Sequence, residues 1–259
     1  MLLAFMNDPW KNVLDEAWLA RQAGFEAFEL AVEHPNATPE KLAAEGKRLA
    51  EELAGFRKIL AHSSWYFSLA HPYPSIRKAF VRETLKAAEA AAGFGARLFT
   101  IHIEPFHFVY KEKAALAGNY FESVGEIAAA CEGNGLVLCV EGFEEASFPL
   151  EKFRELFKEF PKVRMTFDIG HANLIAPNSE GIFRVMREFR KEIAHVHAHD
   201  NKGKTDDHLP IGAGRIPWEA VLARLKEFYD GTITVEDHSP DRDLMKRSRE
   251  KLARLWKGA

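Results

Sequence analysis

The sequence predicts an α/β protein that folds as a single (β/α)8 TIM barrel over residues 1–259, and three observations support this prediction. Eight short apolar runs recur along the chain, each mostly unbroken by polar residues, as expected for strands buried on both faces. Amphipathic stretches with apolar residues three and four positions apart separate these runs. No G-x-G-x-x-G follows the first run, which removes the commonest reason to prefer an open dinucleotide-binding sheet. Closing eight strands into a barrel also leaves no exposed sheet edge.

The individual elements follow from these patterns. Strands are expected at residues 2–6, 25–31, 58–64, 97–103, 136–142, 163–170, 193–200 and 232–237. The clearest helices are expected at residues 12–24, 39–55 and 75–95, each ending at a Gly that suits a helix C-cap. Residues 239–258 are expected to form the eighth helix, with Ser239 as its N-cap and Pro240 in its first turn. Short connections without a linker indicate one domain with its active site at the carboxyl ends of the strands.

The composition limits the class of protein. With 47% hydrophobic residues the chain can build a large core, and its net charge of −3 without a strongly basic block does not indicate nucleic-acid binding. Cys131 and Cys139 are the only cysteines, and the apolar run around Cys139 predicts a buried thiol in a reducing compartment. The first ten residues lack the features of a signal peptide, and no apolar segment is long enough to cross a bilayer. We therefore expect a cytoplasmic protein without a membrane partner.

Polar residues gather at the predicted carboxyl ends of the strands. Strands three to eight end, in order, near His62, His102, Glu141, Asp168, His197 and Glu236. Glu29 lies near the end of the second strand. A single His at a strand end is usually only a hydrogen-bonded polar residue, but six residues in the same position are hard to explain in that way. They converge on one mouth of the barrel, where active sites of this fold form.

The chemistry of these residues predicts a divalent metal ion. Carboxylates crowded together in a buried site repel one another and lose hydration unless they are protonated or bind a cation. A mixture of His, Asp and Glu without Cys suits Zn²⁺, Mn²⁺, Co²⁺ or Fe²⁺. The motif "FDIGHAN" places His171 three residues after Asp168, so that both side chains can face the mouth.

The stretch "HVHAHD" has three imidazoles on one face of the seventh strand, because side chains alternate with a period of two. His195 is the deepest and is expected to be a hydrogen-bonded core residue. His197 is level with the other ligands and is the one expected to bind metal. His199 and Asp200 are expected at the rim, where they either orient ligands or contact substrate.

The loop that follows supplies further candidate ligands. Asp206 and His208 have D-x-H spacing, which allows both side chains to reach one ion, whereas Asp207 is expected to point into solvent. Lys202 can neutralise a phosphate or an enolate, although exposed loop lysines are more often only solvated.

These residues resemble the xylose isomerase-like TIM barrel superfamily, which includes sugar isomerases and epimerases alongside endonuclease IV. The resemblance covers nearly the whole chain and rests on "AHSSW", "TIHIEP", "CVEGF", "FDIGHAN", "HVHAHDNKG", "DDHLPIGAGRIPW" and "TVEDH". A likeness to endonuclease IV implies three zinc ions. Their ligands would be His62, His102 and Glu141 for the first ion, Glu141, Asp168, His197 and Glu236 for the second, and His171, Asp206 and His208 for the third.

The isomerase and epimerase branch implies a simpler centre. Its single ion, usually Mn²⁺, Mg²⁺ or Co²⁺, would be held by Glu141, Asp168, His197 and Glu236, with His171 near the substrate. In that branch Glu141 and Glu236 are also the catalytic residues, which exchange a proton with the carbon next to the carbonyl while the ion polarises the substrate oxygens. The expected cofactor is thus one to three divalent ions of Zn, Mn, Co or Mg.

Departures from endonuclease IV favour the isomerase branch. That nuclease has a His-containing, Gly-rich stretch after its first strand, where this chain has "MNDPWKNV". Its H-x-x-Y pattern becomes Trp65 followed by Tyr66, and no basic stripe surrounds the mouth to meet phosphates. The leading hypothesis is therefore a metal-dependent sugar or sugar-phosphate isomerase or epimerase. The alternative is an endonuclease IV-like multi-zinc phosphodiesterase acting on abasic DNA or another phosphoester, since nine ligands exceed the need of one ion.

The expected partner is a small sugar or sugar phosphate, and a nucleic acid only under the alternative. Substrate contacts are expected from Trp65, Tyr66, His171, His199 and Lys202. Phe106 and Trp218 are further candidates to line the mouth, although Trp218 also suits a core position at a helix start. Residues 106–121 are expected to form either a lid or a subunit contact in a homo-oligomer.

Overall fold

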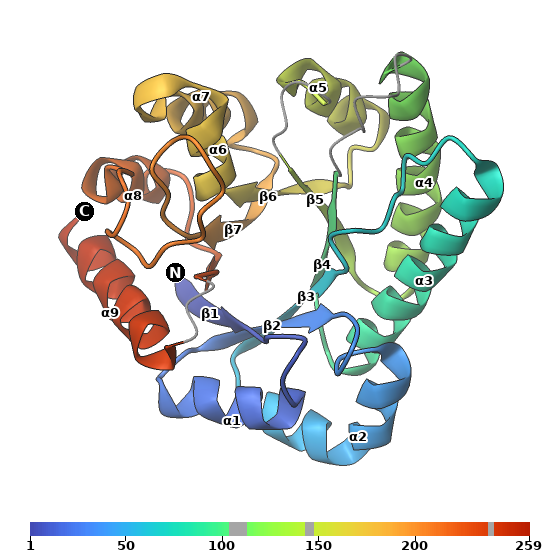
Figure 1. The fold of residues 1–259 in the computed structure, drawn as a ribbon, viewed down its shortest axis with the longest axis horizontal. Helices are drawn as coiled ribbons and strands as arrows, with labels where there is room; N and C mark the ends of the chain where they lie inside the picture. Colours follow the sequence, from blue (N-terminus) through green and yellow to red (C-terminus); the bar gives the residue numbers. More distant parts are fainter. Residues whose placement is uncertain (104–112, 143–147, 238–240) are drawn as a thin grey trace.

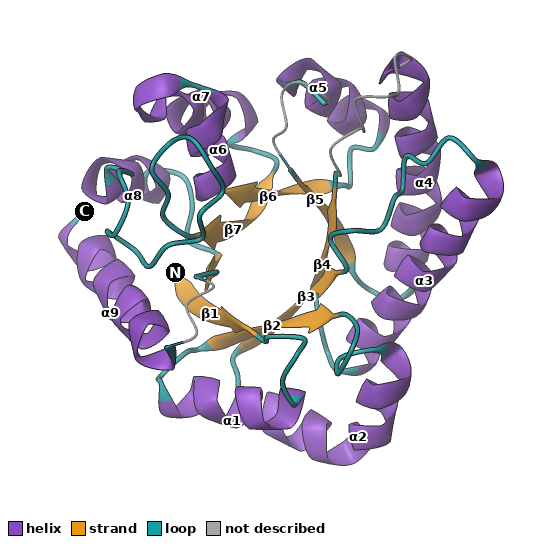
Figure 2. Ribbon diagram, viewed as in Figure 1, coloured by secondary structure: helices purple, strands orange, loops and turns teal. Residues whose placement is uncertain are grey.

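The eight strands form a closed parallel barrel in which each strand pairs with its neighbours in sequence and β8 returns to β1. The computed structural model describes residues 1–103, 113–142, 148–237 and 241–259. Figure 1 traces the strands around a central ring, and Figure 2 shows the helices packed outside it. The predicted fold class is confirmed.

The element bounds agree closely with the sequence patterns. The strands are β1 Leu2–Met6, β2 Ala27–Val32, β3 Lys58–Ser63, β4 Leu98–His102, β5 Val137–Glu141, β6 Arg164–Asp168, β7 Ile193–Ala198 and β8 Thr232–Val235. The helices are α1 Val13–Gln22, α2 Pro39–Leu53, α3 Pro74–Gly93, α4 Lys113–Gly133, α5 Leu150–Glu159, α6 Ile169–Ile175, α7 Glu180–Phe189, α8 Trp218–Lys226 and α9 Arg242–Gly258, with a short 3-10 turn, η1 Pro177–Ser179.

The strands are buried on both faces, as their apolar sequences predict. All six residues of β2 are buried, and Phe28 on its outer face packs against Phe5 and Phe56 under the helices. On the inner face, Ala27 shares a small apolar cluster with Ala4 and Leu60. Because side chains alternate along a strand, the bottom of the barrel interior is apolar and the next layers on the inner face can carry polar groups.

A local signal accounts for the start of α1, and two of the expected helices need correction. Asn12 accepts a hydrogen bond from the amide of Asp15 and caps α1. The last helix begins at Arg242 with Asp241 as its N-cap, rather than at Ser239, and Ser239 and Pro240 lie outside the described residues. Two helices follow β6 where one was expected, because the backbone between them turns through left-handed conformations at positions 178 and 179.

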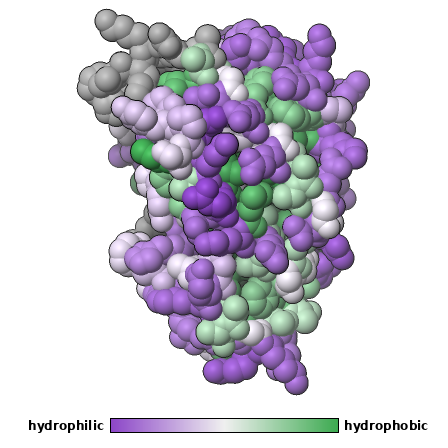
Figure 3. Space-filling model, turned by 90° about the vertical axis from the view of Figure 1, so that its right-hand side faces the viewer, coloured by the Kyte–Doolittle hydropathy of each residue, from purple (hydrophilic) through white to green (hydrophobic). Residues whose placement is uncertain are grey.

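The surface and the cysteines have ordinary features. On the face shown in Figure 3, hydrophilic side chains cover most of the surface and hydrophobic ones form smaller areas between them. Among the residues that the model describes, no helix combines the length and the apolar character needed to cross a bilayer. Cys131 and Cys139 are unpaired and buried, as expected for Cys139. Of the segment expected to form a lid or a subunit contact, residues 113–121 belong to α4, and residues 106–112 lie outside the described part.

Candidate metal centre

Four side chains from four strand ends meet at the mouth of the barrel. Glu141 ends β5, Asp168 ends β6, His197 lies near the end of β7, and Glu236 directly follows β8. One ligand atom from each of the four lies within 4.8 Å of the others. The parallel register makes this possible, since Asp168 pairs with His197 and Glu236 bonds through its amide to the carbonyl of Ala198. This spacing would allow all four side chains to bind the same ion.

Glu141 lies at the centre of this arrangement and is completely buried. Its Oε1 is 2.9 Å from Nδ1 of His197, while its Oε2 is 3.1 Å from Nε2 of His62 and 3.1 Å from Nε2 of His102. Burial would raise the pKa of Glu141, but His197 and His102 outweigh burial and hold that pKa well below its usual range. Glu141 therefore carries a negative charge between the imidazole of His197 on one side and those of His62 and His102 on the other.

Buried oxygen atoms without hydrogen bonds mark the same place. Within the described residues, Oδ2 of Asp168 and Oε2 of Glu236 are buried and accept no hydrogen bond. The other oxygen of Asp168 accepts one from the amide of His171 at 2.6 Å, which also caps α6. Oε2 of Glu236 is 3.4 Å from Nδ1 of His197. Buried carboxylate oxygens normally have partners, so this donor set fits a divalent cation, which would satisfy both atoms.

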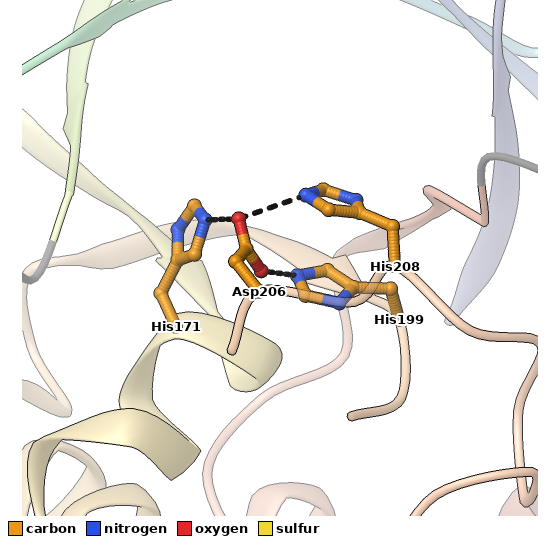
Figure 4. A group of neighbouring side chains, drawn as sticks. All are labelled: His171, His199, Asp206 and His208. Carbon is orange, nitrogen blue, oxygen red and sulfur yellow. Dashed lines mark hydrogen bonds and ion pairs between the residues drawn. The ribbon is translucent and has the colours of Figure 1, made fainter. Parts of the chain in front are cut away.

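A second cluster adjoins the first and contains His171, His199, Asp206 and His208. Figure 4 shows the three imidazoles arranged around the carboxylate of Asp206. Oδ2 of Asp206 is 3.0 Å from Nε2 of His171 and 3.0 Å from Nε2 of His208, and its Oδ1 is 3.5 Å from Nε2 of His199. The structure therefore brings together all three predicted ligands of this group and adds His199 to them.

His199 occupies a different place from the one expected. The sequence predicts a position at the rim, whereas the side chain is fully buried and its ring stacks on that of His208 at 3.8 Å between centroids. Neither ring nitrogen makes a hydrogen bond with the described residues, and Nε2 lies 3.2 Å from Oδ1 of Asp168. A side chain at Gly170 would collide with the ring, since a Cβ there would lie 2.0 Å from it. Glycine in the "FDIGHAN" motif thus makes room for His199.

Asp200 organises the loop that carries Asp206 and His208. Its carboxylate is buried and accepts hydrogen bonds from Nε1 of Trp218 at 2.9 Å and from the amides of Gly212 and Ile216 at 2.8 and 3.2 Å. Asp200 follows the end of β7, and these hydrogen bonds hold the loop in place. His208 has a left-handed backbone with φ 44°, and its Nδ1 is 2.9 Å from the carbonyl oxygen of Glu236. This contact with Glu236 connects the loop to the barrel mouth.

In the second cluster, the carboxylates raise the pKa of the imidazoles and the imidazoles lower the pKa of Asp206. Burial lowers the pKa of His171, but Asp168, Asp206 and Glu141 outweigh it and raise that pKa to about 10. Burial acts in the same way on His208, and the neighbouring carboxylates raise its pKa to about 9. The two imidazoles in turn hold the pKa of Asp206 well below its usual range. Without a metal ion, protons on the imidazoles balance the carboxylates.

Other predicted residues lie in different settings. Trp218 is buried in the core, so its alternative interpretation as a core residue is correct and its place in the mouth lining is not. Trp65 and Tyr66 are 59% and 43% exposed after β3 and stack edge to face, which leaves both rings open to a ligand. Lys202 is exposed, and Asp207 is half-buried and accepts hydrogen bonds from the amide of Lys202 and from Thr205. Phe106 lies outside the described residues.

His195 has the core role that the sequence indicated. Its Nδ1 is 2.7 Å from Oγ1 of Thr232, and its Nε2 is 3.0 Å from Oε2 of Glu29. The sequence patterns indicate no partner for Glu29 and do not single out Glu33. Burial raises the pKa of Glu33, and His62 opposes only part of this effect. Its position in the sequence could have identified Glu33 as a candidate residue of the mouth, because it directly follows β2 just as Glu236 directly follows β8.

Most of the chain matches a known family. Residues 18–255 match a family model described as xylose isomerase-like TIM barrel. The uncharacterized protein MJ1311 of Methanocaldococcus jannaschii is 32% identical over 170 residues, which cover 62% of this chain and 58% of that protein. The chain therefore spans less than two thirds of this curated relative.

Two solved structures show how closely the fold is shared. A D-tagatose 3-epimerase-like protein superposes with a TM-score of 0.85 at 25% identity, over 99% of this chain and 97% of that chain. D-Psicose 3-epimerase from Clostridium cellulolyticum H10, solved with D-tagatose, superposes with a TM-score of 0.78 at 16% identity, over 100% of this chain and 99% of that chain. The second likeness is one of fold alone.

Proposed function

Because the chain belongs to the xylose isomerase-like TIM barrel family, we propose that it is a divalent-metal-dependent sugar isomerase or epimerase. The observation that carries this proposal is that Glu141, Asp168, His197 and Glu236 each bring one ligand atom within 4.8 Å of the others at the barrel mouth. A solved structure of a D-tagatose 3-epimerase-like protein at 25% identity supports a sugar as substrate. The reaction would move a proton at the carbon next to a carbonyl.

The ion would be held by these four side chains, of which two have buried oxygens free to bind it. When bound, it supplies Lewis acidity that polarises the carbonyl and hydroxyl oxygens of the sugar. The residue types suit Mn²⁺, Co²⁺, Zn²⁺ or Mg²⁺. His171 lies 3.7 Å from Glu141 through its Nδ1 and would face the substrate beside the ion.

Two carboxylates are available to exchange the proton. Glu141 on β5 and Glu236 after β8 contact the same imidazole, that of His197, from different strands. Neighbouring imidazoles hold the pKa of both glutamates below the usual range, so both are ionised and can accept a proton. In an epimerisation one ionised glutamate would remove the proton from one face of the carbon. The other glutamate would first take up a proton from water and then deliver it to the opposite face.

The aromatic side chains after β3 would support sugar binding. Trp65 and Tyr66 are exposed and adjoin the strand that delivers His62 to the mouth. Apolar faces of sugar rings stack on such aromatic surfaces, while the ion and carboxylates bind the hydroxyl groups. Lys202, exposed on the loop after β7, would be the cation available for a sugar phosphate.

Deuterium exchange tests the proposal directly. Protein loaded with Mn²⁺ or Co²⁺ is incubated with D-tagatose or D-psicose in D₂O. Proton NMR then follows the loss of the signal of the proton on carbon 3, which deuterium replaces, and the formation of an epimer. Glu141→Gln should slow exchange by about 10²–10⁴-fold, since it removes a base without changing the shape of the side chain. Glu219→Gln, an exposed carboxylate at the start of α8, should exchange at the normal rate.

The metal content of each variant is measured by mass spectrometry, so that loss of the ion is separated from loss of the base. Normal exchange in Glu141→Gln protein would disprove the assigned role of this residue. Absence of exchange with every tested ketose and ion in the wild-type protein would count against the isomerase function itself.

A specific observation favours a second candidate, a phosphoester hydrolase with several zinc ions. The complete set of nine predicted ligands is present in three adjoining groups, with Glu141 shared between two of them. One ion does not need this many ligands, whereas neighbouring ions can activate a water and stabilise a leaving oxygen. Two or three zinc ions per chain together with nicking of an abasic duplex would support hydrolysis. One ion per chain and an intact duplex would exclude it.

A further inference from the structure

Glu29 lies inside the barrel below the candidate metal centre and is completely buried. It points inward from the middle of β2, between Ala27 and Ala31 on the same face of the strand. Its carboxylate oxygens are both 3.2 Å from Nε2 of His197. This nitrogen is on the opposite side of the ring from Nδ1, which faces Glu141 and Glu236.

Two further side chains hold this carboxylate in place. Oγ1 of Thr234 donates a hydrogen bond to Oε2 of Glu29, and Nε2 of His195 lies 3.0 Å from the same oxygen. His195 is itself held by Thr232 through its other ring nitrogen at 2.7 Å. The network is sealed from solvent, since all its members are fully buried.

The spacing of Glu29, His195 and His197 would also admit a cation, but their hydrogen bonds argue against one. Within the described part of the chain, none of their side-chain nitrogen or oxygen atoms lacks a hydrogen-bond partner. The candidate metal centre at the mouth differs in this respect, because buried atoms of Asp168 and Glu236 are without hydrogen bonds there. Glu29 is therefore a hydrogen-bond acceptor beneath the ligands rather than a ligand.

We propose that Glu29 is the positioning residue for His197. By accepting a hydrogen bond from Nε2–H, it holds the proton on that nitrogen and directs the lone pair of Nδ1 toward Glu141 and Glu236, where the ion would bind. Its negative charge also strengthens the imidazole as a donor. The inference rests on the metal dependence of the proposed function and adds to it a residue that contacts neither the ion nor the sugar.

The test measures metal binding rather than turnover. Chelator-treated protein is titrated with Zn²⁺ against a competing dye. Glu29→Gln keeps the shape and one acceptor atom but removes the charge, and it should weaken Zn²⁺ binding by about 10- to 100-fold. Thr100→Val is the matched control, because it breaks a buried hydrogen bond to Thr166 at 2.8 Å in the same barrel interior. Within the described residues, the hydrogen bonds of the His197 ring are to Glu141 and Glu29 and not to Thr100. The Thr100→Val protein should bind Zn²⁺ with normal affinity.

A spectroscopic measurement distinguishes positioning from a general structural effect. In the Zn²⁺-loaded wild-type protein, nitrogen-15 NMR of the His197 ring should show a protonated Nε2 and a metal-bound Nδ1. Glu29→Gln should change the shift of Nε2, whereas Thr100→Val should leave it unchanged. Should Glu29→Gln fail to fold, Thr234→Val removes one donor to Glu29 and should weaken Zn²⁺ binding severalfold.

Normal Zn²⁺ affinity in Glu29→Gln protein would overturn this inference. If that variant does not fold, normal affinity in Thr234→Val protein would overturn it. A metal-bound Nε2 of His197 in the wild-type protein would do the same. None of these results would affect the isomerase function. Weaker binding in a protein that exchanges no proton with any ketose would instead support the role of Glu29 while the proposed function fails.

Discussion

His171 shows how individual residues at the mouth depend on their charged neighbours. Its ring lies between three carboxylates, with Nε2 at 3.0 Å from Asp206 and Nδ1 at 3.7 Å from both Asp168 and Glu141. In an unfolded chain the same imidazole would titrate near 6.5, whereas in the folded protein its pKa is raised to about 10. The folded state therefore binds this proton more tightly.

The pH dependence of stability follows from this difference. A group whose folded pKa is raised contributes its full stabilisation below the unfolded pKa and loses it as the pH rises through the folded pKa. The metal-free protein should therefore lose unfolding free energy between about pH 6.5 and pH 10, by at most about 1.4 kcal/mol per pH unit for each excess proton. Urea titrations at several pH values measure this slope.

His171→Asn provides the comparison for this prediction, since it removes the imidazole but keeps a polar side chain. The slope should become shallower in the variant, with His208 accounting for part of what remains because its pKa is raised to about 9. An unchanged slope in His171→Asn would show that the pH dependence has another origin.

At the scale of elements, the loop between β7 and α8 decides whether the second cluster exists. Figure 1 shows this long segment, in orange, folded against the barrel beside α8. Residues 201–217 contain little regular structure, and a two-residue bridge pairs Asp200 with Leu209 by hydrogen bonds of 2.8 Å in both directions. The loop conformation depends on the buried carboxylate of Asp200 and its hydrogen bonds to Gly212, Ile216 and Trp218.

Asp200→Asn should disrupt this loop. The change places an amide group against backbone and indole N–H donors, which leaves buried donors without an acceptor and should lower the unfolding free energy by about 1–3 kcal/mol. It should also reduce the number of Zn²⁺ ions bound at the cluster of Asp206 and His208, if that cluster is occupied in the wild-type protein. Denaturant unfolding and metal analysis measure the two effects.

Asp207→Asn is the control for this prediction, because Asp207 belongs to the same loop and its side-chain hydrogen bonds within the described residues are to Lys202 and Thr205. Its effect on the unfolding free energy should stay within about 0.5 kcal/mol. Equal stability of the two variants would refute the structural role of Asp200.

At the scale of the whole molecule, the barrel collects ligands from distant parts of the sequence. Glu141 and Glu236 are far apart in the chain, but closure of the sheet from β8 to β1 brings every carboxyl end to the same mouth. An ion bound there would connect β5, β6, β7 and the end of β8. It would bind the folded state and not the unfolded chain, in which these residues are dispersed.

Metal binding should therefore stabilise the whole barrel. At a free-ion concentration 100 times the Kd, one ion adds about 2.7 kcal/mol to the unfolding free energy. Differential scanning calorimetry should show one unfolding transition that moves up by roughly 5–10 °C when Mn²⁺ or Zn²⁺ is added to chelator-treated protein. An unchanged midpoint would contradict a metal centre at the mouth. Two separate transitions would contradict the single domain predicted from the sequence.

Much of the fold and part of the site could be predicted from the sequence, because both depend on local patterns. Apolar runs and amphipathic spacing identify the strands, and a polar residue at a strand end of a barrel has only one mouth to face. The positions of Glu141, Asp168 and His197 follow from these facts. The core position of His195 follows from its depth on the same strand as His197.

Tertiary structure decided what depends on contacts between distant segments. The burial of His199 requires Gly170 in α6, and the function of Asp200 is set by donors from a loop that has no repeating pattern. The contact between Glu29 and His197 crosses the barrel interior, and neither residue has a sequence neighbour that indicates the other. The sequence by itself determined which residue types reach the mouth, since alternation and strand order are local properties. Their grouping into candidate metal sites and supporting hydrogen bonds was decided only by the closure of the sheet and the path of its loops.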